Sequence, residues 1–136
     1  MNKMLRFIIA AFLTGFLFVV MNGLINGNPY AVKLLECFKP ISRQNINVPI
    51  GVLVDLLYGF SISGLFIIIL PVLPSTNGIV KGITFGVGLW FFKVVMGVIS
   101  YWMMFNIPGE TLIYLLFTGL IEMMILGVLN GLIIKK

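Results

Sequence analysis

Four long runs of apolar residues divide the chain, and each run ends at prolines, glycines or charged residues. A run of about 20 apolar residues is long enough to cross the hydrocarbon core of a bilayer as a helix. We therefore predict four transmembrane helices, over about residues 7–27, 49–71, 79–105 and 110–134. The expected fold is an all-α membrane protein whose helices form an antiparallel bundle, with residues 1–136 in a single integral membrane domain.

The first run fits either a signal peptide or a retained helix, because Lys3 and Arg6 precede it. We favour the retained helix. Its apolar length of about 19 residues exceeds that of a typical signal-peptide core, and no small-x-small cleavage site follows it.

The one long connection lies between the first two predicted helices. Asn28 and Pro29 are typical of a helix start, apolar residues follow at helical spacing, and Pro40 interrupts the pattern. About ten residues cannot span a bilayer, so we predict a short amphipathic helix over residues 29–39 on the membrane surface. An ordinary surface loop fits this segment equally well. For Cys37, the single cysteine, a reduced thiol is favoured over palmitoylation.

The distribution of basic residues predicts the orientation. Four crossings place both termini and the loop before the third helix on one side. That side holds five basic residues, Lys3, Arg6, Lys81, Lys135 and Lys136, and the other holds three, Lys33, Lys39 and Arg43. Cytoplasmic segments carry an excess of Lys and Arg, so we expect a multi-pass protein of the inner membrane with cytoplasmic termini.

Two segments of the chain resemble two later ones, which predicts an internal repeat. Ala11, Gly15 and Asn22 align with Gly82, Gly86 and Lys93 of the third predicted helix. Asp55 and Ser63 align with Glu122 and Asn130 of the fourth. Two helices return the chain to the same side, so the units would be tandem two-helix repeats related by an axis along the membrane normal.

Three glycine-bearing stretches carry a family resemblance: residues 51–59 (GVLVDLLYG), 81–90 (KGITFGVGLW) and 119–122 (GLIE). With the long first loop and the Leu-Pro turn, they resemble the YagU-like small four-helix membrane proteins over nearly the whole chain. That family is largely of unknown function, so the resemblance implies a fold and no activity. Histidine is common there where Asp55 and Glu122 stand here, so no role for imidazole carries over.

Each predicted helix contains one polar or charged residue that is costly in a bilayer. These candidate site residues form a predicted buried polar cluster of Asn22, Asp55, Lys93 and Glu122. A charge left at the middle of the bilayer costs a few kcal/mol, so such side chains usually face the bundle interior and pair with one another. We expect Lys93 to face Glu122, with Asp55 nearer the outer surface.

Small residues beside these positions predict the packed face of each helix. The expected packing glycines are Gly15, Gly59, Gly82, Gly86, Gly127 and Gly131. Gly82 and Gly86, like Gly127 and Gly131, have the GxxxG spacing that permits close approach of helices.

The amino-acid composition of the chain argues against several classes of function. The chain is 60% hydrophobic and 10% charged, which argues against a water-soluble fold. It has no histidine and one cysteine, so we expect no metal site and no cofactor. The net charge of +5 comes from residues at chain ends and in loops, so nucleic acid is not an expected partner. No serine has a positioned base beside it, and we expect no enzymatic activity.

Two functional hypotheses remain. The first is a conduit or binding protein for an ion, a proton or a small molecule, which uses the buried polar cluster. The second is a structural or accessory subunit of a larger membrane complex, in which the same residues act only in helix packing. The expected partners are the lipid bilayer and either a second copy of the chain or other membrane proteins.

Overall fold

The structure is a computed structural model that describes residues 2–134, and in that range it contains helices and no strand. The long helical segments are α1 (Lys3–Gly27), α3 (Val48–Ile69), α4 (Gly78–Leu89), the π-helical segment η3 (Trp90–Val95), α5 (Met96–Met104) and α6 (Gly109–Ile133). The 3-10 turn η2 (Leu70–Val72) extends α3, and α4, η3 and α5 form one continuous rod. These four rods are long and apolar enough to cross a membrane, as expected for a multi-pass membrane protein.

Asparagine side chains cap the N-terminal ends of four helices. The side chains of Asn2, Asn28, Asn47 and Asn77 accept hydrogen bonds from main-chain amides in the first turns of α1, α2, α3 and α4. Such caps satisfy amides that have no partner within the helix. The Asn2 cap explains why α1 begins at Lys3, four residues before the predicted start. Lys135 and Lys136, which entered the prediction of orientation, lie outside the described residues.

Glycines set the closest helix contacts, between α1 and α3 and between α4 and α6. Gly59 lies against the backbone of Ala11 and Gly15. Along α4, Gly78, Gly82 and Gly86 lie in turn against Gly131, Gly127 and Met123 of α6. A methyl group at these positions would overlap main-chain atoms, so larger residues would force the helices apart. All six predicted packing glycines lie at these contacts, and Gly78 is one that the sequence analysis did not name.

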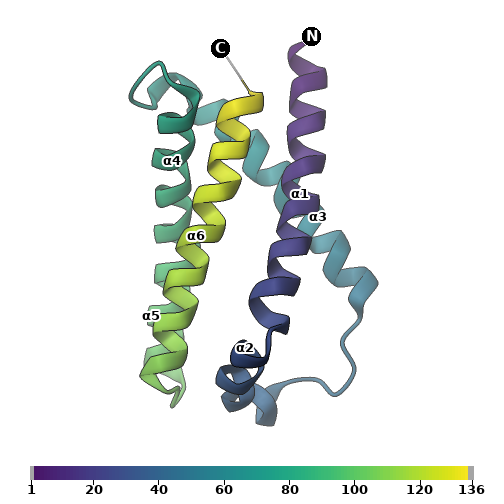
Figure 1. Ribbon diagram of the computed structural model, residues 1–136, viewed down its shortest axis with the longest axis vertical. Coiled ribbons are helices and arrows are strands. Elements are labelled where there is room, and N and C mark those ends of the chain that lie inside the picture. Colours follow the sequence, from purple (N-terminus) through teal and green to yellow (C-terminus); the bar gives the residue numbers. More distant parts are fainter. Residues whose placement is uncertain (1, 135–136) are drawn as a thin grey trace.

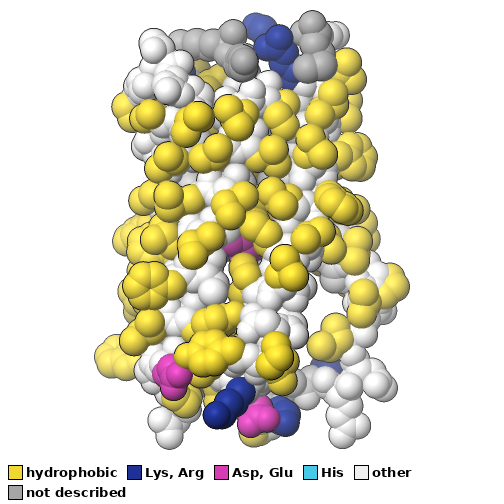
Figure 2. Space-filling view, viewed as in Figure 1, with side chains coloured by type: hydrophobic (Ala, Val, Ile, Leu, Met, Phe, Trp, Pro, Cys, Tyr) yellow, Lys and Arg dark blue, Asp and Glu magenta, His cyan; other side chains and the backbone are white. Residues whose placement is uncertain are grey.

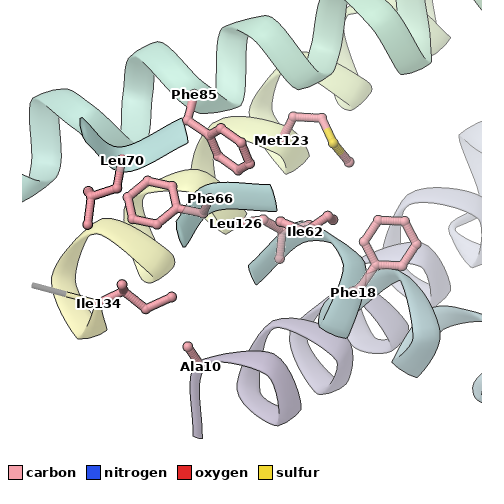
Figure 3. Packing of buried hydrophobic residues seen from close by; sticks show 9 residues of the cluster. All are labelled: Ala10, Phe18, Ile62, Phe66, Leu70, Phe85, Met123, Leu126 and Ile134. Carbon is pink, nitrogen blue, oxygen red and sulfur yellow. The ribbon is translucent and has the colours of Figure 1, made fainter. Parts of the chain in front are cut away.

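The α1–α3 pair and the α4–α6 pair contact each other along α1 and α6, and the two pairs share one hydrophobic core. Figure 3 shows apolar side chains from α1, α3, α4 and α6 gathered together there. Within it, the rings of Phe66 and Phe85 meet edge to face with centroids 5.1 Å apart. Figure 1 shows the start of α1 and the end of α6 at the same end of the molecule, with α3 crossing behind α1 at a clear angle.

A buried polar network ties three helices together at the centre of the molecule. Thr14, Ser63 and Asn130 are fully buried. The Asn130 amide group donates to Thr14 Oγ1 (3.0 Å) and to a main-chain carbonyl of its own helix, while Ser63 Oγ donates to Asn130 Oδ1 (2.6 Å). Because each side chain has a partner, this network serves packing rather than ligand binding.

The connection after α1 is helical, and it extends farther than residues 29–39. It consists of α2 (Pro29–Leu34) and the 3-10 helix η1 (Leu35–Ile41), so Pro40 lies inside the helical segment rather than ending it. A 3-10 turn tolerates Pro40 because only one main-chain donor is lost, and the Ser42 amide then bonds to the carbonyls of Phe38 and Lys39. The segment packs against the start of α6, where Thr111 Oγ1 donates to the Leu34 carbonyl (2.9 Å).

The outer surface of the rods is apolar. Figure 2 shows hydrophobic side chains over the middle of the molecule, with Lys, Arg, Asp and Glu gathered mainly at its two ends. In a soluble protein a continuous apolar surface of this size would be exceptional, whereas lipid tails would cover it in a bilayer.

Candidate functional site

The four predicted polar residues differ in burial. Glu122 is 6% exposed, Asn22 and Asp55 are half-buried, and Lys93 is exposed. Of the four residues of the predicted buried polar cluster, Glu122 is thus buried, whereas Lys93 is not.

Asn22 and Asp55 meet as partners across α1 and α3. The Asn22 side-chain amide donates to Asp55 Oδ1 at 3.2 Å. The contact lies one to two turns from the close glycine contact of the same helices, so Gly15 and Gly59 bring the two polar residues within reach. This bond gives the Asp55 carboxylate one protein partner, and the residue as a whole is half-buried.

Lys93 reaches the rings of α1 and α3 instead of pairing with Glu122. Its ammonium lies 4.6 Å from the ring centroid of Phe18 and 4.9 Å from that of Tyr58. The two rings are stacked, with centroids 5.4 Å apart and planes inclined by 25°. Across the described residues, no ion pair within 4.0 Å joins Lys93 to a carboxylate. The predicted Lys93–Glu122 contact is thus replaced by cation–π contacts.

Lys93 lies within the π-helical segment η3. A π-helical turn holds more residues than an α-helical turn, so side chains within it leave the face that a 3.6-residue period predicts. Two contacts with α6 accompany the segment: Trp90 Nε1 donates to the Leu116 carbonyl (2.9 Å), and Gly119 gives room to the Val94 side chain. Such π-helical turns are frequent at functional sites.

Glu122 lines a cavity that it shares with Lys93 and Asn22. The cavity measures about 200 Å³, and its wall also includes the polar side chains of Asn26 and Thr118. Among the described residues, no group donates a hydrogen bond to Glu122 Oε1, and this atom is buried. A buried carboxylate oxygen without a partner is costly, so the site favours an additional proton or cation beside Glu122.

Lys93 also lines a second cavity. It measures about 280 Å³ and has mostly apolar walls, including Ile62, Leu65 and Met123. Lys93 is the residue common to both cavities in the described part of the chain.

The aromatic pair was missed by the sequence analysis. Phe18 precedes Asn22 by four residues on α1, and Tyr58 follows Asp55 by three on α3. These spacings place each ring on the same helix face as its polar neighbour. The two rings could have been predicted from the sequence, because each lies one helical turn from a residue of the predicted polar cluster.

Comparisons with protein-family models, with curated proteins and with solved structures found no match for this chain.

Proposed function

We propose that the chain is a non-enzymatic inner-membrane protein that binds, and lets pass, a proton or a small monovalent cation at Glu122. The observation that carries this proposal is the buried, unpartnered Oε1 of Glu122 on a cavity shared with Lys93. Two carboxylates, Glu122 and Asp55, and one ammonium lie around this region. When all three are ionised their net charge is −1, which one monovalent cation or one proton balances.

The proposed architecture is an antiparallel bundle of two tandem two-helix repeats. Gly59 lies against Ala11 and Gly15, and Gly127, one position after the residue that aligns with Gly59, lies against Gly82 and Gly86. The order of the α4–α6 contacts supports opposite helix directions, because residue numbers rise along one helix as they fall along the other. Ser63 and Asn130, which the repeat aligns, bond to each other, as expected near an axis that relates the two units.

The proposed orientation places the start of α1 and the end of α6 in the cytoplasm. Lys3, Arg6 and Lys81 lie toward that end, and no acidic residue of the chain lies near them in sequence. The positive-inside rule favours this side as cytoplasmic. The Glu122 cavity, which includes residues from the last two turns of α1, then opens toward the outer half of the membrane.

In the proposed mechanism the Lys93 ammonium competes with the bound cation for the Glu122 carboxylate. While its ammonium rests on Phe18 and Tyr58, Glu122 is free to hold a proton or a cation from the cavity. When the side chain turns toward Glu122, the two opposite charges pair and the bound cation is released. The cation–π contacts make the first position stable without a carboxylate partner.

Flux into proteoliposomes tests the proposal. An internal pH-sensitive dye reports proton entry driven by a potassium diffusion potential, and uptake of radioactive sodium reports cation entry. We expect one of the two fluxes above that of protein-free liposomes, and its loss in Glu122→Gln and Lys93→Met at unchanged fold and abundance. Glu110→Gln, on the same helix but outside the cavity, is the control and should retain the flux.

The proposal fails if neither ion enters above background or if Glu122→Gln conducts like the wild type. A collapse of either single variant that the double variant repairs would instead indicate a structural pair. That outcome would favour the alternative, a structural or accessory subunit, which the Asn22–Asp55 hydrogen bond between α1 and α3 also supports.

A further inference from the structure

A larger cavity lies at the opposite end of the described structure from α2, where α3 ends, α4 begins and α6 ends. It measures about 630 Å³. Its wall is polar along the loop at Ser75, Thr76 and Asn77, and apolar at Leu70, Leu73 and Leu132. The Glu122 site does not share any of the residues that line it.

Lys81 lines this cavity and is 7% exposed. Within residues 2–134, no hydrogen bond or ion pair joins its ammonium to another group. Most of this residue is shielded from solvent and no counter-charge lies beside it within that range, so an anion in the cavity would gain a charge-assisted partner in Lys81.

The start of α4 contributes to the same wall through Gly78 and Ile79. Asn77 caps the Ile79 amide, and the Lys81 amide bonds to the Asn77 carbonyl. No acceptor within residues 2–134 is seen for the amides of Gly78 and Val80. Free amides at the start of a helix carry partial positive charge and bind phosphate groups well.

The charge distribution also favours an anion. The four acidic residues of the chain are Glu36, Asp55, Glu110 and Glu122, and none of them lines this cavity. Glu36 and Glu110 belong to η1 and the first turn of α6, at the other end of the molecule. Lys3 and Arg6 lie in the first turns of α1, toward the same end as the cavity.

From these observations we infer that the cavity binds the phosphate group of an anionic ligand, held by the Lys81 ammonium and the first amides of α4. The leucines on its apolar wall suit the glycerol and first methylenes of a phospholipid, so an anionic lipid headgroup is the favoured source of the phosphate. Free phosphate has the same binding chemistry, and the experiment separates the two sources.

The test measures thermal unfolding of the purified full-length protein in a neutral detergent. Three additions are titrated separately: phosphatidylglycerol, phosphatidylcholine and inorganic phosphate. Because a ligand stabilises the state it binds, we expect phosphatidylglycerol to raise the unfolding temperature and phosphatidylcholine to leave it nearly unchanged. If inorganic phosphate raises the unfolding temperature as much as phosphatidylglycerol does, the cavity binds phosphate and free phosphate is its ligand.

Substitutions at the cavity decide whether the effect belongs to this site. Lys81→Gln should weaken the apparent affinity for phosphatidylglycerol about tenfold, as expected for one charge-assisted hydrogen bond. Lys3→Gln, an exposed lysine toward the same end, should change it less than about twofold.

A second pair of variants does not alter a buried residue. Ser75 is exposed at the cavity rim with a φ of 78°, a conformation that Asp and Asn tolerate. Ser75→Asp should weaken phosphatidylglycerol binding through like-charge repulsion, and Ser75→Asn, of the same shape, should not. Equal stabilisation by both lipids, or unchanged selectivity in Lys81→Gln and Ser75→Asp, would overturn the inference.

Discussion

Lys93 and Phe18 are joined by a cation–π contact in which the ammonium lies 4.6 Å from the ring centroid. This contact keeps the lysine out of an ion pair with Glu122, although both residues line one cavity. The aromatic ring and the carboxylate are thus two alternative partners for one ammonium. In the proposed mechanism, the balance between these two partners sets how readily an external cation binds to Glu122.

Phe18→Leu should shift this balance toward Glu122. Loss of about 1 kcal/mol of cation–π attraction should raise the cation or proton concentration for half-maximal binding roughly fivefold. Phe12→Leu is the control, because Phe12 lies on the same helix and contacts Phe60 rather than Lys93. Isothermal titration or a pH titration of the purified protein measures the change, and equal effects of the two variants would contradict the proposed competition.

Gly82→Ala should destabilise the α4–α6 contact. Its new methyl group would meet the Gly127 carbonyl and the Val128 backbone, and overpacking of this kind costs about 1–3 kcal/mol. Gly88→Ala is the matched control on α4, since nothing lies within 4 Å of its added methyl group. That variant should be neutral or stabilising by up to about 1 kcal/mol because alanine has the higher helix propensity. Reversible unfolding in mixed micelles would give both values, and similar losses would show that the contact is looser than described.

Asn130→Leu should weaken the centre of the bundle by leaving Ser63 and Thr14 without their shared partner. Interhelical hydrogen bonds in membranes contribute about 0.6 kcal/mol on average and up to about 1.7 kcal/mol, which sets the expected loss. Ser100→Ala is the control, because that hydroxyl bonds only to the carbonyl one turn earlier on its own helix. The two variants are compared by the same unfolding measurement, and no excess loss in Asn130→Leu would mean that the network adds nothing to stability.

The contact between Tyr30 and Glu110 predicts a dependence on alkaline pH. The Tyr30 hydroxyl donates to Glu110 Oε1 at 2.7 Å, and this hydrogen bond, followed by burial and the Glu110 charge, raises the pKa of Tyr30 above its ordinary value of 10.0. Because the folded-state pKa is the higher one, the contact stabilises docking of α2 below pH 10.0 and is lost as pH rises through the raised pKa.

Glu110→Gln should lower the pKa of Tyr30 toward 10.0, since the amide still accepts a hydrogen bond but carries no charge. Ultraviolet titration of tyrosinate absorbance, with Tyr30→Phe subtracted to isolate this residue, measures the difference. An identical Tyr30 titration in the wild type and in Glu110→Gln would show that the hydrogen bond does not persist in solution.

The four helices and their packing glycines could be predicted from the sequence, because the length of an apolar run and the spacing of small residues are properties of a single helix. Capping by Asn2 and Asn77 could be anticipated in the same way. The position of Lys93 could not be anticipated, because this residue lies in a π-helical turn that a 3.6-residue period does not predict. Two tertiary contacts accompany that turn: the Trp90 bond to α6 and the packing of Val94 over Gly119. Three-helix contacts such as the Asn130 network likewise depend on which helices become neighbours, which a period of 3.6 residues does not specify.

Carbodiimide labelling of the full-length protein in liposomes tests the Glu122 site most directly, because carbodiimides modify protonated carboxyl groups that are shielded from bulk water. We predict that Glu122 is the principal labelled residue by mass spectrometry and that labelling falls as pH or the concentration of the bound cation rises. Glu110, at the first turn of α6, serves as the internal reference and should label weakly. Absent labelling of Glu122, or labelling that neither pH nor sodium nor potassium changes, would contradict an exchangeable proton or cation at this carboxylate.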